Sequence, residues 1–369
     1  MEVGDYKLKH PEEIETPAFL VYQDLVHHNI REALRICGSG ERMVPHFKTH
    51  KSAEVLKLQM EAGITAFKVS TVKEAEVVAE NGVQEIIVAY PIPHPKKLER
   101  LMLLKKRYPE ADIKVIACTP QHLEVMSQVA IAHKQELGVY MDLDPGEHRT
   151  GVQPGEAAGR FYAEIAKTPG LKPAGIHAYD GGVGNSPEPG PREAIVKENI
   201  EKIRDAIDRA ERQGLDVPDV VAGGSWSFSF YAAEGDIRVS PGKWIYWDLM
   251  NCIMTDLDFK LAGVVLGQVV DRHVPQDTVT TDLGIKGISH DPPLARRLRV
   301  VGQEQMELVS QSEEHGVIKQ NGAALDVGDF FIAQPGHVCS TTVKFPYALV
   351  VDSEGEIVGQ YNHQARDRV

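Results

Sequence analysis

Residues 42–90 read RMVPHFKTHKSAEVLKLQMEAGITAFKVSTVKEAEVVAENGVQEIIVAY, and they decide the fold because short β-rich runs alternate with longer helical ones. The strand-like runs are RMVPHFK, AFKVS and EIIVAY, and the segments between them have the apolar spacing of amphipathic helices. Both helical segments end in glycine, which is typical of the position just after a helix. This repetition predicts parallel strands joined by helical crossovers.

The same alternation continues to about residue 248, with further strand-like runs DIKVIA, ELGVYMDLD, KPAGIHAY, DVVAGG and KWIYW. Eight such units in about 230 residues match a (β/α)8 TIM-type barrel, which typically takes about 250. An open doubly wound sheet is the competing fold, but no GxGxxG follows the first strand.

After about residue 256 the runs are β-rich, separated by turn residues and nearly free of helical periodicity, which predicts an all-β domain. We therefore expect a barrel over residues 15–255 and a β-rich C-terminal domain over residues 256–369. Residues 1–14 either stand apart or join the second domain.

Composition excludes several classes of function. The chain has 369 residues and a net charge of −13, without a long basic stripe, so we expect no nucleic-acid partner. No apolar run is long enough for a membrane span, and the first residues lack the pattern of a secretory signal. The four cysteines are far apart, which indicates neither a disulfide framework nor a zinc ribbon. The expected location is cytoplasmic.

Polar residues follow several of the predicted barrel strands, at the end where barrel enzymes carry their chemistry. His46 and Lys48 close the first strand run, Arg149 and Thr150 follow the fifth, and Tyr179 ends the sixth. The small residues Gly223, Gly224 and Ser225 follow the seventh strand, in a loop that binds phosphate in many barrels.

Each of these groups also has a simpler interpretation. A lysine beside positive charge in a desolvated site has a lowered pKa, as a Schiff base requires, yet the exposed first turn of a helix is the commoner setting for a stretch such as that around Lys48. Arg149 is suited to an anionic ring oxygen, but surface salt bridges are the commoner use of arginine. The sequence GGS is also typical of ordinary turns.

A second constellation lies near the C-terminus in AQPGHVCSTT. In a β context, His337 and Cys339 are expected on the same face of a strand. An imidazole and a thiolate suit zinc and leave coordination positions open, although a packed cysteine beside a turn histidine is the alternative. His315, in the polar segment QSEEHGV, belongs either to a solvated loop or to the outer shell of a metal site.

The separate pieces occur in the order TPAFLVYQDLVHHNI, PHFKTHK, DPGEHRTG, HAYDG, GGS, SPGKWIYWD, DLGIKGISHD, SEEHG and GHVC. This set resembles the D-threonine aldolase and D-serine dehydratase family, pyridoxal-phosphate enzymes of the alanine-racemase fold type, over almost the whole chain. One departure is GGSWSFSF, which places Trp226 and Phe228 where smaller residues are expected and leaves the size of the pocket open.

The resemblance implies a role for each matched residue. Lys48 would carry pyridoxal 5'-phosphate as a Schiff base, and Arg149 would face the phenolic oxygen of the cofactor. Gly223, Gly224 and Ser225 would hold its phosphate. His46, Thr150 and Tyr179 are the remaining candidate cofactor contacts. His337 and Cys339 would bind a divalent metal, either zinc, manganese or magnesium, with His315 as an outer-shell candidate.

The resemblance also implies a lyase acting on D-3-hydroxy amino acids and a homodimer. We favour a D-threonine aldolase-like retro-aldol cleavage to glycine and an aldehyde. The main alternative is a dehydratase of the D-serine or D-3-hydroxyaspartate type, which the His-x-Cys pair favours. An amino-acid racemase would also use this fold but has no need of the metal pair. A non-catalytic pyridoxal-phosphate-binding protein would need the barrel alone.

Overall fold

The structure is a computed structural model that describes residues 1–181 and 186–368. Its contacts divide the chain into two compact units. The barrel unit comprises Ala33–Lys48, Leu56–Gly242 and the chain from Asp367 onward. The β unit comprises Met1–Glu32, Thr49–Val55 and Lys243–Arg366. These boundaries differ from those of the predicted domains, mainly because the first 32 residues cluster with the C-terminal segment.

The barrel unit is built on a curled sheet of seven parallel strands in the order β10-β9-β8-β7-β6-β5-β4. Their bounds are β4 Ala66–Val69, β5 Glu85–Val88, β6 Asp112–Ala117, β7 Leu137–Leu143, β8 Leu171–Ala178, β9 Val220–Ala222 and β10 Arg238–Val239. Extended residues 43–46 connect the two edges of this sheet, since Met43 bridges Val239 in β10 and His46 bridges Lys68 in β4. The predicted first strand is therefore present as two isolated bridges.

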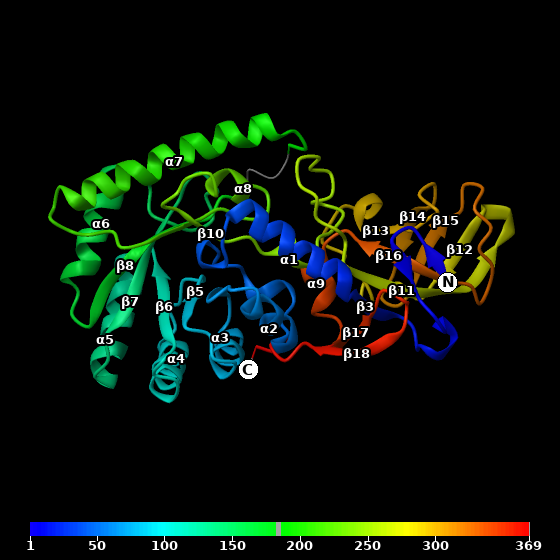
Figure 1. The fold of residues 1–369 in the computed structure, drawn as a ribbon, viewed down its shortest axis with the longest axis horizontal. Helices are drawn as coiled ribbons and strands as arrows, with labels where there is room; N and C mark the ends of the chain where they lie inside the picture. Colours follow the sequence, from blue (N-terminus) through cyan, green and yellow to red (C-terminus); the bar gives the residue numbers. More distant parts are fainter. Residues whose placement is uncertain (182–185, 369) are drawn as a thin grey trace. The chain divides into compact units, whose positions relative to one another are not determined.

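Helices alternate with these strands and cover their outer side (Figure 1). Their bounds are α2 Ala53–Glu61, α3 Val72–Glu80, α4 Pro95–Arg107, α5 Pro120–His133, α6 Glu156–Lys167, α7 Pro189–Glu211 and the single turn α8 Phe228–Tyr231, while α1 (Gln23–Cys37) precedes residues 43–46. Thr71 and Thr119 cap α3 and α5, because each side chain accepts a hydrogen bond from a backbone N–H in the first turn.

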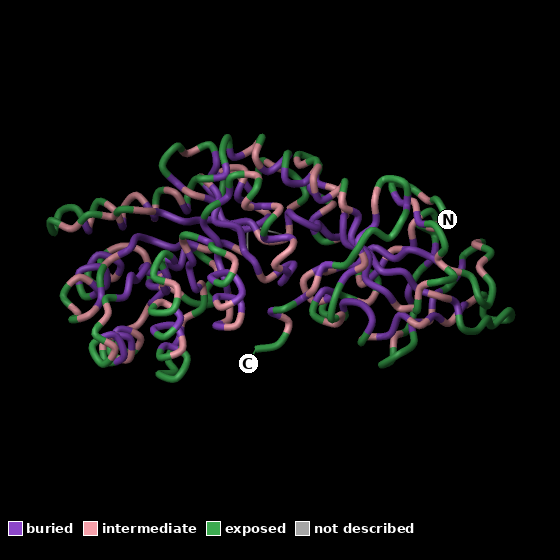
Figure 2. Tube along the Cα trace, turned by 60° about the horizontal axis from the view of Figure 1, so that its bottom comes forward, coloured by how far each residue is buried: buried purple, intermediate pink, exposed green. Residues whose placement is uncertain are grey.

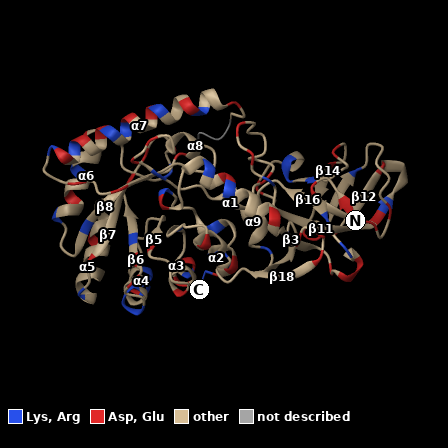
Figure 3. Cartoon of the chain, in the orientation of Figure 1, with Lys and Arg blue, Asp and Glu red and all other residues tan. Residues whose placement is uncertain are grey.

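One layer of apolar side chains fills the interior of the curl. It takes one residue from each of six strands and one from the bridging segment, namely Val44, Ala66, Ile87, Ile116, Tyr140, Ala174 and Val221. All seven are nearly or completely buried, as expected for the packed core of a barrel. Figure 2 shows buried residues along the inner parts of the trace and exposed residues mainly at its outer turns and coils, and Figure 3 shows charges of both signs along α7.

The prediction that KWIYW forms the last strand of the barrel is wrong. Residues Lys243–Ile245 form a 3-10 helix, and the strand that completes the sheet is β10, seven residues before the predicted centre. The aromatic and β-branched residues of this segment have a high strand propensity. In the structure Trp244, Tyr246 and Trp247 are buried without forming a strand.

The β unit contains a nine-stranded mixed sheet and a small hairpin, as the fold prediction requires. The hairpin is β1 Glu2–Val3 and β2 Tyr6–Lys7, and the sheet comprises β3 Ala18–Tyr22, β11 Gly263–His273, β12 Thr278–Thr281, β13 Leu298–Val300, β14 Glu307–Gln311, β15 Gly316–Lys319, β16 Phe330–Pro335, β17 Tyr347–Val351 and β18 Ile357–Asn362. The early strand β3 lies between β11 and β17, which explains why the first residues belong to this unit. The short helix α9 (Val338–Thr342) follows β16.

No helix among the described residues is long and apolar enough to cross a membrane.

Two buried histidines lie in the β unit. His50 is 1% exposed and His363 is 4% exposed. Burial is the main cause that lowers the pKa of His50 to about 3 and the pKa of His363 to about 4. In the unfolded chain both rings titrate near the ordinary value, so the unfolded chain binds more protons over the interval between these values and about 6.5.

The contribution of these two histidines to the free energy of unfolding should therefore be fully present above pH 6.5 and decrease as the pH drops toward 4. For His50→Gln, denaturant unfolding should show a loss between pH 6.5 and 4.5 that is smaller than that of the native chain by about 2 kcal/mol. His273→Gln, which changes an exposed ring, serves as the control and should leave the loss unchanged. An equal loss in the native chain and in His50→Gln would contradict the neutral, buried state of His50.

Candidate active site

A cavity of about 290 Å³ opens at the carboxyl ends of the barrel strands. Its lining residues are His46, Lys48, Lys68, Ser70, Ala89, Tyr90, Pro91, Ile116, Arg149, Thr150, His177 and Tyr179. Five of them, His46, Lys48, Arg149, Thr150 and Tyr179, are predicted site residues that the sequence places at the ends of different strands. The structure therefore brings together in one pocket residues from separate stretches of sequence.

Lys48 reaches the pocket from the segment that connects the sheet edges. It lies in a short 3-10 helix, Phe47–Thr49, directly after the bridge between His46 and Lys68. The backbone N–H of His46 donates to the carbonyl of Pro241 at 2.9 Å. The backbone N–H of Lys48 donates to Nδ1 of His46 at 3.2 Å. The backbone before Lys48 is thus fixed on both sides, and the half-buried side chain lines the cavity.

Arg149 and Thr150 enter from the loop that follows β7. The guanidinium of Arg149 lies 4.6 Å from the centre of the Tyr179 ring, a cation–π contact. The hydroxyl of Thr150 donates to Asp142 at 2.8 Å, and the other oxygen of Asp142 is 2.7 Å from Nδ1 of His177. Hydrogen bonds thereby connect the ends of β7 and β8.

The turn at residues 223–225 is fastened to the end of β8. A Cβ atom on Gly224 would lie 3.0 Å from the Tyr179 ring, so glycine allows the backbone to approach this tyrosine closely. The N–H of Gly224 donates to Ser227 Oγ at 3.0 Å, and Ser227 donates to Asp180 at 2.6 Å. The hydroxyl of Ser225 accepts from the N–H of Gly242 at 3.1 Å.

Asp180, which follows Tyr179 in the HAYDG motif at the end of the predicted sixth strand, is a buried anchor of this turn. Burial raises its pKa to about 6, although hydrogen bonds from Ser227, Tyr231 and Asn199 oppose the shift. Trp226 and Phe228, the two residues that are larger than expected after the GGS turn, lie close to this turn in the sequence. Phe228 is fully buried in α8, and the carbonyl of the half-buried Trp226 accepts a hydrogen bond from Arg192.

Lys68 is a second lysine of the pocket that the sequence analysis missed. It lies in β4 and is only 2% exposed. Its amine donates to Ser240 Oγ at 2.6 Å and is 3.3 Å from Nε2 of His177. A signal was present in the sequence, because AFKVS places a charged residue inside a strand whose other residues indicate complete burial.

The pocket fits an anionic aromatic aldehyde such as pyridoxal phosphate. Among its described lining residues three are cationic, Lys48, Lys68 and Arg149, and none is acidic. Lys48 offers the amine that such an aldehyde needs, and Arg149 offers a permanent planar cation. Gly224 keeps the turn at residues 223–225 free of side-chain bulk where the turn approaches Tyr179, although the N–H groups of Gly223 and Gly224 already donate to Ala178 and Ser227. None of the three residues of this turn is among the described residues that line the cavity.

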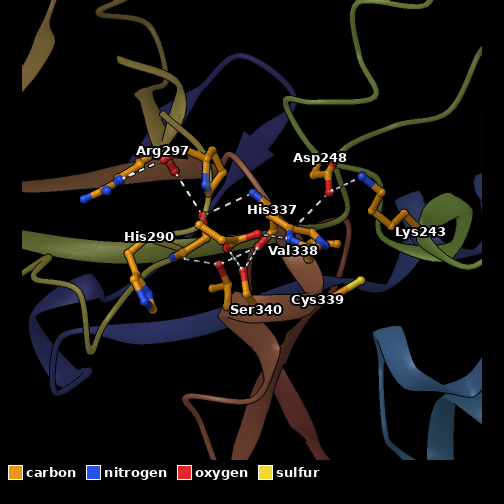
Figure 4. A network of polar contacts seen from close by, with 12 residues as sticks. Lys243, Asp248, His290, Arg297, His337, Val338, Cys339 and Ser340 are labelled. Carbon is orange, nitrogen blue, oxygen red and sulfur yellow. Dashed lines mark hydrogen bonds and ion pairs between the residues drawn. The ribbon is translucent and has the colours of Figure 1, made fainter. Parts of the chain in front are cut away.

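The predicted metal pair lies in the β unit (Figure 4). The expectation that His337 and Cys339 share one face of a strand is wrong, because β16 ends at Pro335 and His337 is the N-cap of α9. Gly336 makes this sharp change possible, since a Cβ there would lie 2.0 Å from the carbonyl oxygen of Arg296. The two side chains nevertheless interact across the first turn of the helix.

Asp291 holds the ring of His337 through a hydrogen bond to Nδ1 and also accepts a hydrogen bond from Ser340. Burial opposes charge on His337, but the hydrogen bonds with Asp291 and Cys339 outweigh burial and raise its pKa to about 10. The sulfur of Cys339 is 3.2 Å from the hydroxyl of Thr49. His315 is exposed in the turn between β14 and β15, where its carbonyl accepts from the N–H of Ser312.

The donors present fit a metal site with open coordination positions. Because Asp291 occupies Nδ1 of His337, Nε2 is the nitrogen left for a metal, an arrangement that is common in zinc proteins. Surroundings that favour a positive charge on the ring also favour a cation in place of the proton. The residues described by the structure contain no group of three or more His, Cys, Asp or Glu side chains that could hold a metal, so His337 and Cys339 remain a pair of candidate ligands.

Comparison with known proteins finds a matching protein family for each of the two parts of the chain. The family model of the alanine racemase N-terminal domain matches residues 21–249, and a putative serine dehydratase domain family matches residues 262–351. The chain is 30% identical to a 3-hydroxy-D-aspartate aldolase of Paracoccus denitrificans, over 89% of this chain and 86% of the relative. It is 25% identical to a D-threo-3-hydroxyaspartate dehydratase of Delftia, over 93% and 96% of the two chains.

Among solved structures, the D-threonine aldolase of Filomicrobium marinum superposes with a TM-score of 0.89 at 25% identity, over 96% of both chains. This match confirms the predicted alanine-racemase-like architecture. The chain therefore belongs to the D-threonine aldolase and D-serine dehydratase family, whose barrel is the alanine racemase N-terminal domain, and it is an enzyme of that family's pyridoxal-phosphate-dependent lyase type.

Proposed function

We propose that this enzyme is a pyridoxal-phosphate- and divalent-metal-dependent aldolase that cleaves D-3-hydroxy amino acids to glycine and an aldehyde. The observation that carries the proposal is the shared cavity of Lys48, Arg149 and Tyr179 at the carboxyl ends of the strands. A reactive amine, a fixed cation and an aromatic face around one pocket suit an anionic pyridine aldehyde, and an exposed basic turn does not explain them.

The roles of the residues follow from their chemistry. Lys48 would bind the aldehyde carbon of the cofactor, and Arg149 would supply a cation for its ring oxygen. Gly223 and Gly224 would leave room for the phosphate and Ser225 would offer its hydroxyl, since the N–H groups of the two glycines already donate to Ala178 and Ser227 within the protein. When bound, pyridoxal phosphate supplies an electron sink for the bond that breaks next to the substrate nitrogen. His46 and Thr150 keep Lys48 and the ends of β7 and β8 in position.

The metal pair supports a substrate with a hydroxyl group. His337 and Cys339 would hold the metal, and a divalent metal at this site would supply a Lewis acid for an oxygen ligand. A racemase has no use for such a group, and a cofactor carrier without catalysis does not require the β unit that follows the barrel. Zinc suits this imidazole and thiolate pair best, since manganese and magnesium prefer oxygen ligands.

Two reactions of a D-3-hydroxy amino acid are considered at this site, namely cleavage of the Cα–Cβ bond and loss of the hydroxyl group. The Paracoccus and Filomicrobium proteins named as aldolases support cleavage between Cα and Cβ. The Delftia protein named as a dehydratase, together with the thiolate ligand Cys339, supports the alternative loss of the hydroxyl group. In that alternative Lys48 takes the proton from Cα, and a keto acid and ammonia are the products. We also propose a homodimer in solution, as the family resemblance implies.

The purified chain should release glycine and an aldehyde from D-threonine or D-3-hydroxyaspartate, and EDTA should abolish this activity. Lys48→Ala should lower the rate at least about a thousandfold, a small part of the acceleration typical of enzymes. Lys57→Ala, which changes an exposed lysine on the following helix, should retain full activity. Keto acid and ammonia without aldehyde would establish the dehydratase instead, and activity that survives EDTA would contradict the metal site.

Asp291→Asn should weaken metal binding about 10- to 100-fold, because loss of an outer-shell carboxylate leaves the ligating histidine less basic and less well oriented. Competition for zinc with a chromophoric chelator measures this affinity directly. Asp326→Asn, which removes an exposed carboxylate paired with Arg272, is the matched control and should bind zinc like the native chain. Equal affinities for all three proteins would refute the role of Asp291.

A further inference from the structure

Two neutral acceptors hold the buried amine of Lys68. Ser240 Oγ lies 2.6 Å from this amine, and the hydroxyl hydrogen of Ser240 is donated to the carbonyl of Gly223 at 3.0 Å. A hydroxyl has one hydrogen, so Ser240 accepts a hydrogen bond from Lys68 and does not donate one to it.

His177 is the second acceptor, because its tautomer is fixed by Asp142. Nδ1 of His177 lies 2.7 Å from a carboxylate oxygen of Asp142, so Nδ1 carries the hydrogen. Burial lowers the pKa of His177, which keeps the ring neutral. The lone pair of Nε2 is then left for the Lys68 amine, which lies 3.3 Å away.

The third hydrogen-bonding position of the Lys68 amine has no partner among the described residues. An ammonium carries three hydrogens, and Ser240 and His177 accept two of them. Lys68 is only 2% exposed and lines the cavity. A buried lysine whose partners are neutral is costly, so a remaining donor at the wall of a cavity indicates a ligand that brings negative charge.

The amine lies among the residues proposed to hold the cofactor. It is 5.6 Å from the centre of the Tyr179 ring, and the guanidinium of Arg149 is 4.6 Å from the centre of the same ring. Ser240 connects the amine to the carbonyl of Gly223, the first residue of the turn proposed for the phosphate. An anion bound in this cavity therefore comes within the surroundings of Lys68.

The electrostatic surroundings of Lys68 have both signs. Burial is the largest influence and lowers its pKa to about 7, and nearby cations contribute to this shift. The charged and titratable groups that face Lys68 from neighbouring elements are Lys48, Arg149, Asp142, Asp180 and His177. The two carboxylates favour the ammonium, whereas the two cations disfavour it.

We propose that Lys68 is a contact residue of the cofactor and donates its third hydrogen to an anionic oxygen of pyridoxal phosphate. The phosphate and the ring oxygen both have this chemistry. The contact requires the ammonium, so it is made at acidic pH and is lost when the amine is neutral. This inference rests on the proposed function, since it adds a residue to the site that binds the cofactor.

The pH dependence of the contact follows from linkage. An anion beside the amine stabilises the ammonium, so the pKa of Lys68 in the complex is higher than the value of about 7 in the free chain. The affinity that Lys68 contributes is therefore fully present below pH 7, and it is lost as the pH rises through the higher pKa of the complex.

The test measures the affinity of the full chain, after removal of the cofactor, for pyridoxine 5'-phosphate at pH 6 and pH 9. This probe has the phosphate and the ring oxygen of the cofactor but no aldehyde, so it forms no covalent bond with Lys48. Lys68→Met and Lys68→Gln both remove the charge. Lys114→Met is the control, because Lys114 pairs with Glu85 and Asp112 and is not among the described residues that line the cavity.

At pH 6, both Lys68 variants should bind the probe about 10- to 100-fold less tightly than the native chain, as expected for the loss of a hydrogen bond to a charged group. At pH 9 the difference should shrink to about twofold or less, because native Lys68 has then largely lost its proton. Lys114→Met should match the native chain at both values. Ionisation of the free probe is the same in every measurement and cancels in the ratio of affinities.

Phosphorus NMR of the bound probe at pH 6 distinguishes the two anionic groups. A resonance that differs between the native chain and Lys68→Gln would assign the contact to the phosphate. An unchanged resonance, together with the loss of affinity, would assign it to the ring oxygen.

A purely structural role would lower the affinity by the same factor at pH 6 and pH 9. That result, or equal affinities of the native chain and the Lys68 variants at pH 6, would overturn the inference and leave the proposed function intact. If Lys68→Met does not fold, Lys68→Gln alone decides, since its amide can still form hydrogen bonds in the buried site. Failure of the native chain to bind either the probe or pyridoxal phosphate would instead overturn the proposed function.

Discussion

Residues 43–46 bridge both edge strands of the barrel unit, and the position of Lys48 depends on this closure. The bridge to β10 fixes the start of the segment, and the bridge to β4 fixes His46 beside Lys68. Because all strands of the sheet run in parallel, the loops that follow them meet at one end. Lys48 therefore joins Arg149, Thr150 and Tyr179 in one cavity although the sequence separates it from them by more than 100 residues.

Gathering three cations in a small cavity is unfavourable unless an anion or a shift in protonation compensates for it. The described walls supply hydrogen-bond partners and, through Asp142 and Asp180, negative charge behind the first layer. This arrangement leaves the pocket positive enough for an anionic cofactor, and it gives Lys68 a place in the same electrostatic balance as Lys48. The environment of His337 also favours positive charge, because the hydrogen bond between Asp291 and Nδ1 of the ring raises the pKa of His337.

The sequence predicted most of the barrel because helix caps, glycine stops and apolar periodicity are local signals. The exception, KWIYW, shows the limit of such signals, since aromatic residues fill a core equally well from a strand or from a 3-10 helix. The proximity of His337 and Cys339 was predictable from their spacing, but their helical setting was not, because it depends on how Gly336 packs against Arg296. Asp291 and Lys68 were missed for a related reason. Their partners come from distant segments, and a sequence does not show which strand register or loop brings them together.

The central claim is that Lys48 is the residue that holds the cofactor. The most direct test is reduction of the pyridoxal-phosphate-loaded enzyme with borohydride, followed by proteolysis and mass spectrometry of every lysine-containing peptide. The account predicts the pyridoxyl-phosphate mass on Lys48, with Lys68 and Lys51 unmodified. A label on Lys68, or no label on any lysine, would contradict it.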